Sequence, residues 1–207
     1  MRNYLLAVLL IAGLAPSGNL KLDESVLVES PDDIFQYDDG TSWWLTWTGT
    51  YRGVWFNTAD FYGSPVPCHI GQTEHWFYHY GYPYVWDASA FYCEIYSGDQ
   101  TGPDAELDHT SATATHNAPV YVGHSPPVYV DPDFWVIENT EMSTGGWPST
   151  LGDNSPNSVD HSFYSDDFQT WEPWVIQGPG ANDLFIRGEV EPYYLEGFTW
   201  GSIKTLF

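Results

Sequence analysis

The stretch Phe91-Tyr-Cys-Glu-Ile-Tyr96 alternates in polarity, with Phe91, Cys93 and Ile95 at its odd positions. Successive side chains of a β-strand point to opposite faces, so this pattern predicts a strand with one buried face and one wet face. Other short runs, rich in β-branched and aromatic residues and bounded by Gly, Pro, Asn or Asp, also predict strands. These runs cover residues 53–57, 75–80, 128–130, 134–137 and 184–190.

Outside the N-terminal 17 residues, no long stretch has the 3.6-residue period of an amphipathic helix. Many short strands with turn-rich connections favour two packed sheets, and the absence of a Cys-Trp-Cys pattern disfavours an immunoglobulin arrangement. We therefore predict an all-β protein. Its single antiparallel two-sheet β-sandwich, of jelly-roll type, spans residues 34–190 between extended N- and C-terminal segments.

The two ends of the chain differ from this body. Residues 1–17 begin with Met1-Arg2-Asn3 and continue with an apolar run, which is typical of a secretory signal. The run is shorter than the roughly 20 residues that span a bilayer, so we expect no transmembrane segment in the mature chain. Residues 18–33 form an N-terminal arm that ends in a polar break, and residues 191–207 form a C-terminal tail.

The arm has the apolar spacing of a strand. We expect it to pair with a neighbouring subunit, although a disordered tether is an equally good interpretation of a chain end. Its apolar residues, expected to face the neighbour's core, are Leu20, Leu22, Val26 and Val28.

The charge of the chain limits its partners. The sequence has 28 acidic and five basic residues, a formal net charge of −23 at pH 7. Nucleic acids and anionic membranes are bound by clustered Lys and Arg, so a nucleic-acid partner is excluded and docking on an anionic membrane surface is disfavoured. Disorder is disfavoured because 43% of the residues are hydrophobic and 18% aromatic. The partners that this charge still allows are cations, neutral glycans and other copies of the protein.

Cys68 and Cys93 are the only two cysteines. In an exported chain an even pair predicts a disulfide, and no second cysteine lies two residues away to favour a metal site. Three histidines, His69, His75 and His79, lie close together in the sequence. On a strand His75 and His79 would be about 13 Å apart, too far to share a zinc ion. We interpret these histidines as part of a half-exposed aromatic strand.

Carboxylates in the expected turns suggest structural calcium. Ca²⁺ takes about 6–8 oxygen ligands, which loop carboxylates and carbonyls supply, but Asp is also common in plain solvated turns. No loop has EF-hand spacing. The candidate calcium ligands are Asp38, Asp39, Asp99, Asp104, Asp153 and Asp160.

No catalytic motif is found. The sequence has no Gly-x-Ser-x-Gly, no His-Glu-x-x-His, no Walker loop and no Cys–His pair in a known catalytic motif, so we expect no enzyme. Exposed aromatic rings are candidates for sugar stacking or for burial against another subunit. These candidates are Trp43, Trp44, Tyr82, Tyr84 and Trp147.

Several motifs occur in an order that resembles jelly-roll modules of secreted bacterial cell-surface proteins. The resemblance extends from about residue 35 to residue 190, and its motifs are Tyr37-Asp-Asp-Gly40, the 97–104 segment, Asp133-Phe-Trp-Val136, Leu151-Gly-Asp153, His161-Ser-Phe163, Trp171 and the 183–190 segment. Such modules are usually adhesive, structural or glycan-binding, and some acidic single-domain relatives are similar to extracellular filament subunits.

The resemblance and the composition together predict the function. We expect a non-catalytic, secreted, cell-surface structural subunit that assembles with copies of itself into a filament by strand exchange. The alternative is a carbohydrate-binding module that uses the exposed Trp and Tyr residues.

Overall fold

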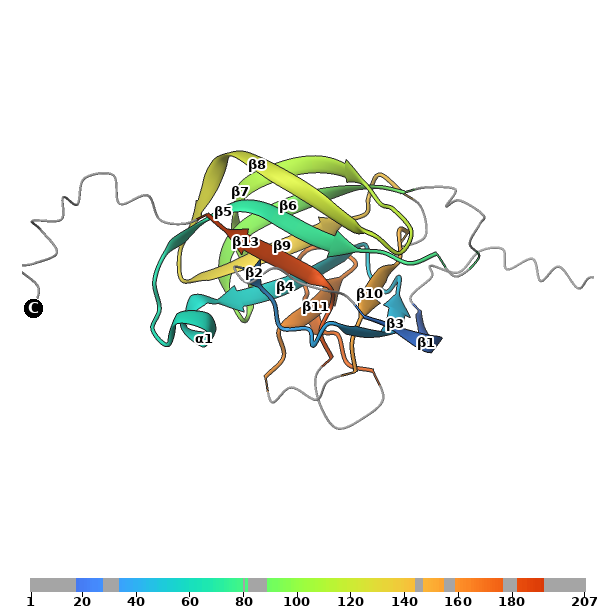
Figure 1. Ribbon diagram of the computed structural model, residues 1–207. Helices are drawn as coiled ribbons and strands as arrows, with labels where there is room; N and C mark the ends of the chain where they lie inside the picture. Colours follow the sequence, from blue (N-terminus) through green and yellow to red (C-terminus); the bar gives the residue numbers. More distant parts are fainter. Residues whose placement is uncertain are drawn as a thin grey trace, which may run out of the picture.

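The computed structural model describes residues 18–27, 34–79, 81, 89–143, 147–154, 159–176 and 182–191 (Figure 1). The predicted signal and all of the predicted tail except Glu191 lie outside these ranges. Within the described ranges, no helix has the length and apolar character needed to cross a membrane.

The protein is an antiparallel all-β sandwich, as predicted, and its two main sheets lie in separate layers (Figure 1). In spatial order, the six-stranded sheet contains β12 (Glu172–Pro173), β11 (Ser162–Ser165), β4 (Tyr51–Asn57), β9 (Asp133–Asn139), β6 (Ala90–Asp99) and β7 (Gly102–Thr113). The four-stranded sheet contains β2 (Ile34–Phe35), β13 (Ile186–Val190), β5 (Cys68–Trp76) and β8 (Pro119–Val130). The jelly-roll type of the sandwich stays a prediction.

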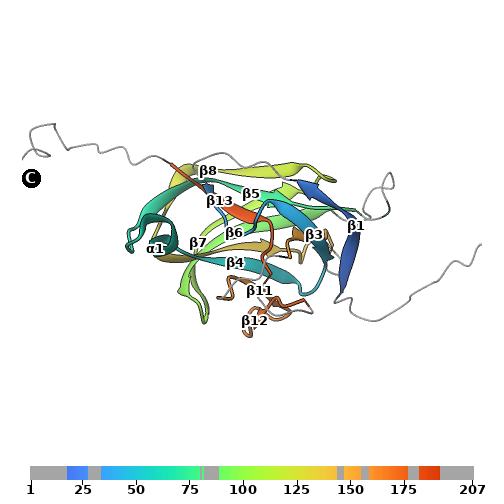
Figure 2. The ribbon, with the colours of Figure 1, turned by 60° about the horizontal axis from the view of Figure 1, so that its bottom comes forward.

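A small third sheet lies at one end of the sandwich. It consists of β1 (Asn19–Leu27), β3 (Thr41–Thr46) and β10 (Thr150–Gly152), with β3 in the middle. The one described helix, α1 (Thr58–Tyr62), lies at the opposite end (Figure 2). Its N-cap is Asn57, whose side chain accepts a hydrogen bond from the Ala59 amide, and its C-cap is Gly63, whose φ of 72° suits glycine.

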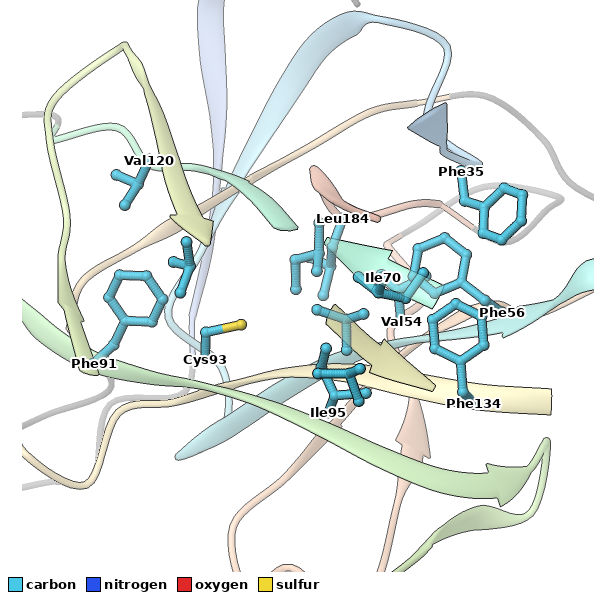
Figure 3. Close-up of a cluster of buried hydrophobic side chains, with 14 of the residues drawn as sticks. Phe35, Val54, Phe56, Ile70, Phe91, Cys93, Ile95, Val120, Phe134 and Leu184 are labelled. Carbon is cyan, nitrogen blue, oxygen red and sulfur yellow. The ribbon is translucent and has the colours of Figure 1, made fainter. Parts of the chain in front are cut away.

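The main core fills the space between the two larger sheets (Figure 3). Phe91, Cys93 and Ile95 are fully buried in it, so the predicted inward face of this strand is confirmed. The opposite face is less wet than predicted, because Glu94 is also buried. Glu94 Oε1 accepts a hydrogen bond of 2.7 Å from Asn139 Nδ2, and burial raises the pKa of the Glu94 carboxyl.

The outer face of the six-stranded sheet carries a second apolar cluster. Trp55 and Trp135 are register partners on β4 and β9, and both are buried on this side. Trp171 packs over them, with its ring centroid 5.0 Å from that of Trp135. Gly53 permits this packing, because a Cβ there would lie 3.2 Å from Trp135 and 3.3 Å from Trp171.

A buried ion-pair triad joins the four-stranded sheet to the segment before β3. Arg187 on β13 donates from Nε to Asp38 Oδ2 at 2.9 Å and from Nη1 to Glu74 Oε1 at 2.8 Å. Arg187 and Glu74 are also register partners across β13 and β5. Because buried charges lose their hydration, the carboxylates are needed to keep the guanidinium in the interior.

We predict that Asp38→Asn lowers the free energy of unfolding by about 3 kcal/mol, because it removes the bidentate counter-ion of a buried guanidinium. Asp39→Asn is the matched control: Asp39 is exposed and its Oδ1 accepts only a local bond from the Thr41 amide, so we expect a change within about 0.5 kcal/mol. Equal effects of the two substitutions in denaturant unfolding would contradict this assignment.

Candidate functional site

The centre of the sandwich contains a polar cluster built around His75. This residue lies on β5 and is fully buried, so the prediction of a half-exposed position is wrong for it. Its Nδ1 lies 3.1 Å from Glu138 Oε1 on β9, and its Nε2 lies 3.0 Å from Thr73 Oγ1. The inward face of β5 therefore carries two polar residues, which partners from the facing sheet satisfy.

Cys93 meets this cluster from β6. Its Sγ lies 3.1 Å from Thr73 Oγ1, the same hydroxyl that lies 3.0 Å from His75 Nε2. His124, on β8, is buried and its Nε2 lies 3.4 Å from the same hydroxyl. The Nδ1 of His124 lies 2.7 Å from Asp108 Oδ2 on β7. Two imidazoles, each anchored by a carboxylate, thus face one sulfur.

At the other end of the cluster, Glu138 contacts Arg52 of β4. Arg52 Nε lies 3.5 Å from Glu138 Oε2 and donates to Thr150 Oγ1 at 2.9 Å, while the Thr150 hydroxyl hydrogen-bonds to the same carboxylate. Arg52 Nη2 donates to the Pro148 carbonyl at 2.6 Å. Arg52, Glu138 and Thr150 are all fully buried.

The electrostatics of the cluster favour its charged forms. Burial alone would lower the pKa of His75, but Cys93 and Glu138 raise it to about 10. Burial alone would raise the pKa of Cys93, but His75, His124 and Thr73 lower it to about 7. Burial also opposes the charge on His124, yet Cys93 and Asp108 raise its pKa. The opposite charges grouped around the Thr73 hydroxyl therefore outweigh desolvation at all three groups.

The predicted disulfide is not formed: Cys68 and Cys93 are both free and buried. Cys93 Sγ contacts Thr73, and Cys68 is at the start of the same β5 strand, roughly 16 Å from Thr73 at about 3.3 Å per residue. A disulfide needs Cα atoms within about 7 Å. In its apolar surroundings Cys68 has a pKa raised by burial to about 11.

The candidate calcium residues fall in three places. The first place, just before β3, contains Asp38, which binds Arg187, and Asp39, whose amide donates a hydrogen bond of 3.1 Å to Asp153 Oδ2. Asp99 and Asp104 lie at the β6–β7 turn, where Asp99 Oδ1 accepts from the Thr101 amide. The Asp160 carbonyl accepts from Gln100 Nε2 at 3.1 Å. In the described ranges, no three or more His, Cys, Asp or Glu side chains are grouped to hold a metal ion.

The predicted aromatic platform is not a single surface. Trp43 and Trp44 are both half-buried, and Trp44 packs on the main core while its Nε1 donates to Asn154 Oδ1 at 3.2 Å. Trp147 stacks on Trp47, with ring centroids 5.6 Å apart. Tyr82 and Tyr84 lie outside the described residues.

An open pocket of about 440 Å³ lies between the β6–β7 turn and the loop that follows β11. Polar groups dominate its walls, and two aromatic rings contribute to them. The side chains around it include Asp99, Thr101, Asp104, Phe168, Gln169 and Trp171. Of these, the sequence had singled out Asp99 and Asp104 as calcium candidates and Trp171 as part of a motif.

The N-terminal arm is also placed by the structure. Residues 19–27 form β1, which contains Leu20, Leu22 and Val26; Val28 lies outside the described residues. β1 runs antiparallel to β3, with Leu20 opposite Leu45 and Val26 opposite Ser42, and its register shifts between Lys21 and Val26. Within the described part of the chain, β1 has no strand partner other than β3.

Comparison with protein-family models, curated proteins and solved structures finds no match to this chain.

We predict that Glu138→Gln lowers the free energy of unfolding by about 3–5 kcal/mol, because it leaves Arg52 and His75 buried without their shared anion. Glu106→Gln is the control. The Glu106 side chain is half-exposed and faces only the exposed side of β6 and β7, so we expect less than about 1 kcal/mol. If chemical denaturation showed equal losses of unfolding free energy for the two variants, the buried Glu138 carboxylate would contribute no more to stability than an exposed one.

Proposed function

We propose that the protein is a non-catalytic extracellular structural subunit that assembles into a filament by exchanging β1 between copies. The observation that carries this proposal is the position of β1 at the chain's N-terminal side, paired with β3 at the edge of the small third sheet. Because β1 is not enclosed between two strands, it can leave one β3 and pair with another without threading the chain.

Edge pairing supplies the energy of assembly. Without β1, the outer edge of β3 presents unpaired backbone N–H and C=O groups, which readily accept a strand from another chain. A β1 strand from a second copy restores the same hydrogen bonds that the first copy lost. Such an exchange is a low-cost domain swap, and a head-to-tail contact that does not close continues as a fibre.

The few basic residues of the chain lie in its interior or in its terminal segments. Between residues 34 and 191 the sequence has two basic residues, Arg52 and Arg187, and both are buried in ion pairs. The remaining basic residues belong to the terminal segments: Lys21 in β1, Lys204 in the tail and Arg2 in the predicted signal. β1 contains Asp23 and Glu24 as well as Lys21, so its net charge is −1 and its pairing with an acidic neighbour relies on backbone hydrogen bonds rather than on charge attraction.

Two further arguments come from the sequence. Its resemblance to surface modules that include filament subunits agrees with a structural role, and it has no catalytic motif. The predicted secretory signal would deliver the protein to the cell surface, where a filament would be built.

Glycan binding is the second candidate function. The open pocket beside Trp171 favours it, because a ring, two carboxylates and an amide can meet the apolar face and the hydroxyls of a sugar. If this pocket binds a glycan, Gln169→Ala should weaken polysaccharide binding to the monomer at least several-fold without changing its melting temperature. Absence of any binding on a glycan array would remove this candidate.

We predict that deletion of residues 19–27 leaves a folded monomer that no longer forms polymers under conditions in which the chain that begins at residue 18 does. A peptide of residues 18–27 should bind the truncated protein by occupying the edge of β3. Negative-stain microscopy and analytical ultracentrifugation measure both effects.

The control for this deletion is a chain that ends at Glu191, which should polymerise normally. Normal polymers from the chain without residues 19–27 would remove β1 as the exchanged strand and point to the C-terminal tail. A full mature chain that never polymerises would contradict the proposed function as a whole.

A further inference from the structure

The buried cluster is a chain of potential charges that alternate in sign. Each link joins a group that can be positive to one that can be negative. The carboxylates contact their arginine or histidine partners directly, and the Thr73 hydroxyl connects the Cys93 sulfur to both imidazoles. In order, the six residues are Arg52, Glu138, His75, Cys93, His124 and Asp108.

Four of the five links cross between the two main sheets. Glu138 on β9 contacts His75 on β5, which is connected to Cys93 on β6 through the Thr73 hydroxyl. The same hydroxyl connects Cys93 to His124 on β8, which contacts Asp108 on β7. The chain of polar groups therefore passes back and forth across the main apolar core, whose own contacts carry little directional preference.

The orientation of the two imidazoles determines where their protons lie. Each histidine turns Nδ1 toward a carboxylate, Glu138 or Asp108, so Nδ1 carries the proton that donates to it. Both Nε2 atoms then lie beside the hydroxyl of Thr73, and that hydroxyl lies 3.1 Å from Cys93 Sγ. A sulfur bounded by two such imidazoles loses its proton to Nε2 most readily, because the carboxylate behind the ring stabilises the resulting imidazolium.

We propose that Cys93 is held as a thiolate between two imidazolium side chains and acts as a redox-sensitive ionic lock between the two sheets. The lock is independent of filament assembly, because its residues are buried within one chain. It needs Cys93 reduced and unpaired, which agrees with the distance that separates it from Cys68.

Oxidation of the sulfur by a peroxide opens the lock. The thiolate sulfur attacks one oxygen of hydrogen peroxide, so that an S–O bond forms and the O–O bond breaks. The product is a sulfenic acid, and the leaving hydroxide takes a proton from the facing imidazolium to become water. Because Cys93 is fully buried, the reaction proceeds only from transiently opened molecules, and the uncharged product no longer binds the two imidazoles as an anion.

The thiolate is tested by ultraviolet absorbance, since a thiolate absorbs where a thiol does not. At a pH of about 8, which lies between the folded and ordinary pKa values of Cys93, the native protein should show one thiolate. Cys68→Ser should keep this absorbance, because Cys68 is a buried thiol. Cys93→Ser should lose it, and on acidification the signal of the native protein should disappear with a midpoint near 7.

The lock is tested by the melting temperature after peroxide treatment. We expect a fall of several degrees in the native protein and in Cys68→Ser, reversed by dithiothreitol, and no change in Cys93→Ser. If Cys93→Ser does not fold, the absorbance of the native protein before and after unfolding at the same pH still decides the protonation state.

Three results would overturn the proposal. The first is a native protein without thiolate absorbance. The second is an unchanged melting temperature when mass spectrometry shows oxygen on Cys93. The third is a stoichiometric metal in the purified protein that is lost in Cys93→Ser, because the sulfur would then be a ligand rather than a free anion.

Discussion

The contact between Glu138 and His75 is the interaction on which the interior of this protein depends. It joins a strand of the six-stranded sheet to a strand of the four-stranded sheet where neither side chain reaches water. A buried carboxylate loses several kcal/mol of hydration, which a single partner does not restore. Arg52 and Thr150 must therefore complete the contacts of the anion, and Thr73 those of the imidazole. The Thr73 hydroxyl also contacts Cys93, so the polar groups form one unit.

The sequence predicted the elements that depend on local pattern. The alternation at 91–96 and the run at 134–137 both form strands. The apolar side of the first is buried in the main core, and the second is buried on both of its sides. The polar chain was missed because its partners are far apart in the sequence: His75 and Glu138 are 63 residues apart. The one local sign of this polar chain in the sequence was Arg52, which stands beside an apolar run. A cation within a strand that is buried on both faces needs an anion nearby. The disulfide prediction failed because counting two cysteines says nothing about where their strands place them.

Charge is divided unequally between the inside and the outside of the molecule. Both arginines of the body are used in the interior, so the surface of residues 34–191 has carboxylates but no lysine or arginine. Such a surface repels other copies of itself, so the proposed assembly needs a directional contact to bring copies together. Backbone pairing between β1 and β3 is a contact of that kind, because its hydrogen bonds are fixed by register and do not depend on surface charge.

The central claim is that β1 of one subunit pairs with β3 of the next, and a cross-link within the polymer tests it most directly. Leu27 and Thr41 are register partners, and opposite residues of antiparallel strands lie about 4.5–5.5 Å apart, within reach of a disulfide. Polymers of the double variant Leu27→Cys with Thr41→Cys are oxidised and then analysed on a denaturing, non-reducing gel. Strand exchange predicts a ladder of covalently linked multimers. Cross-linked monomers alone would show that β1 stays on its own β3 and would contradict the account.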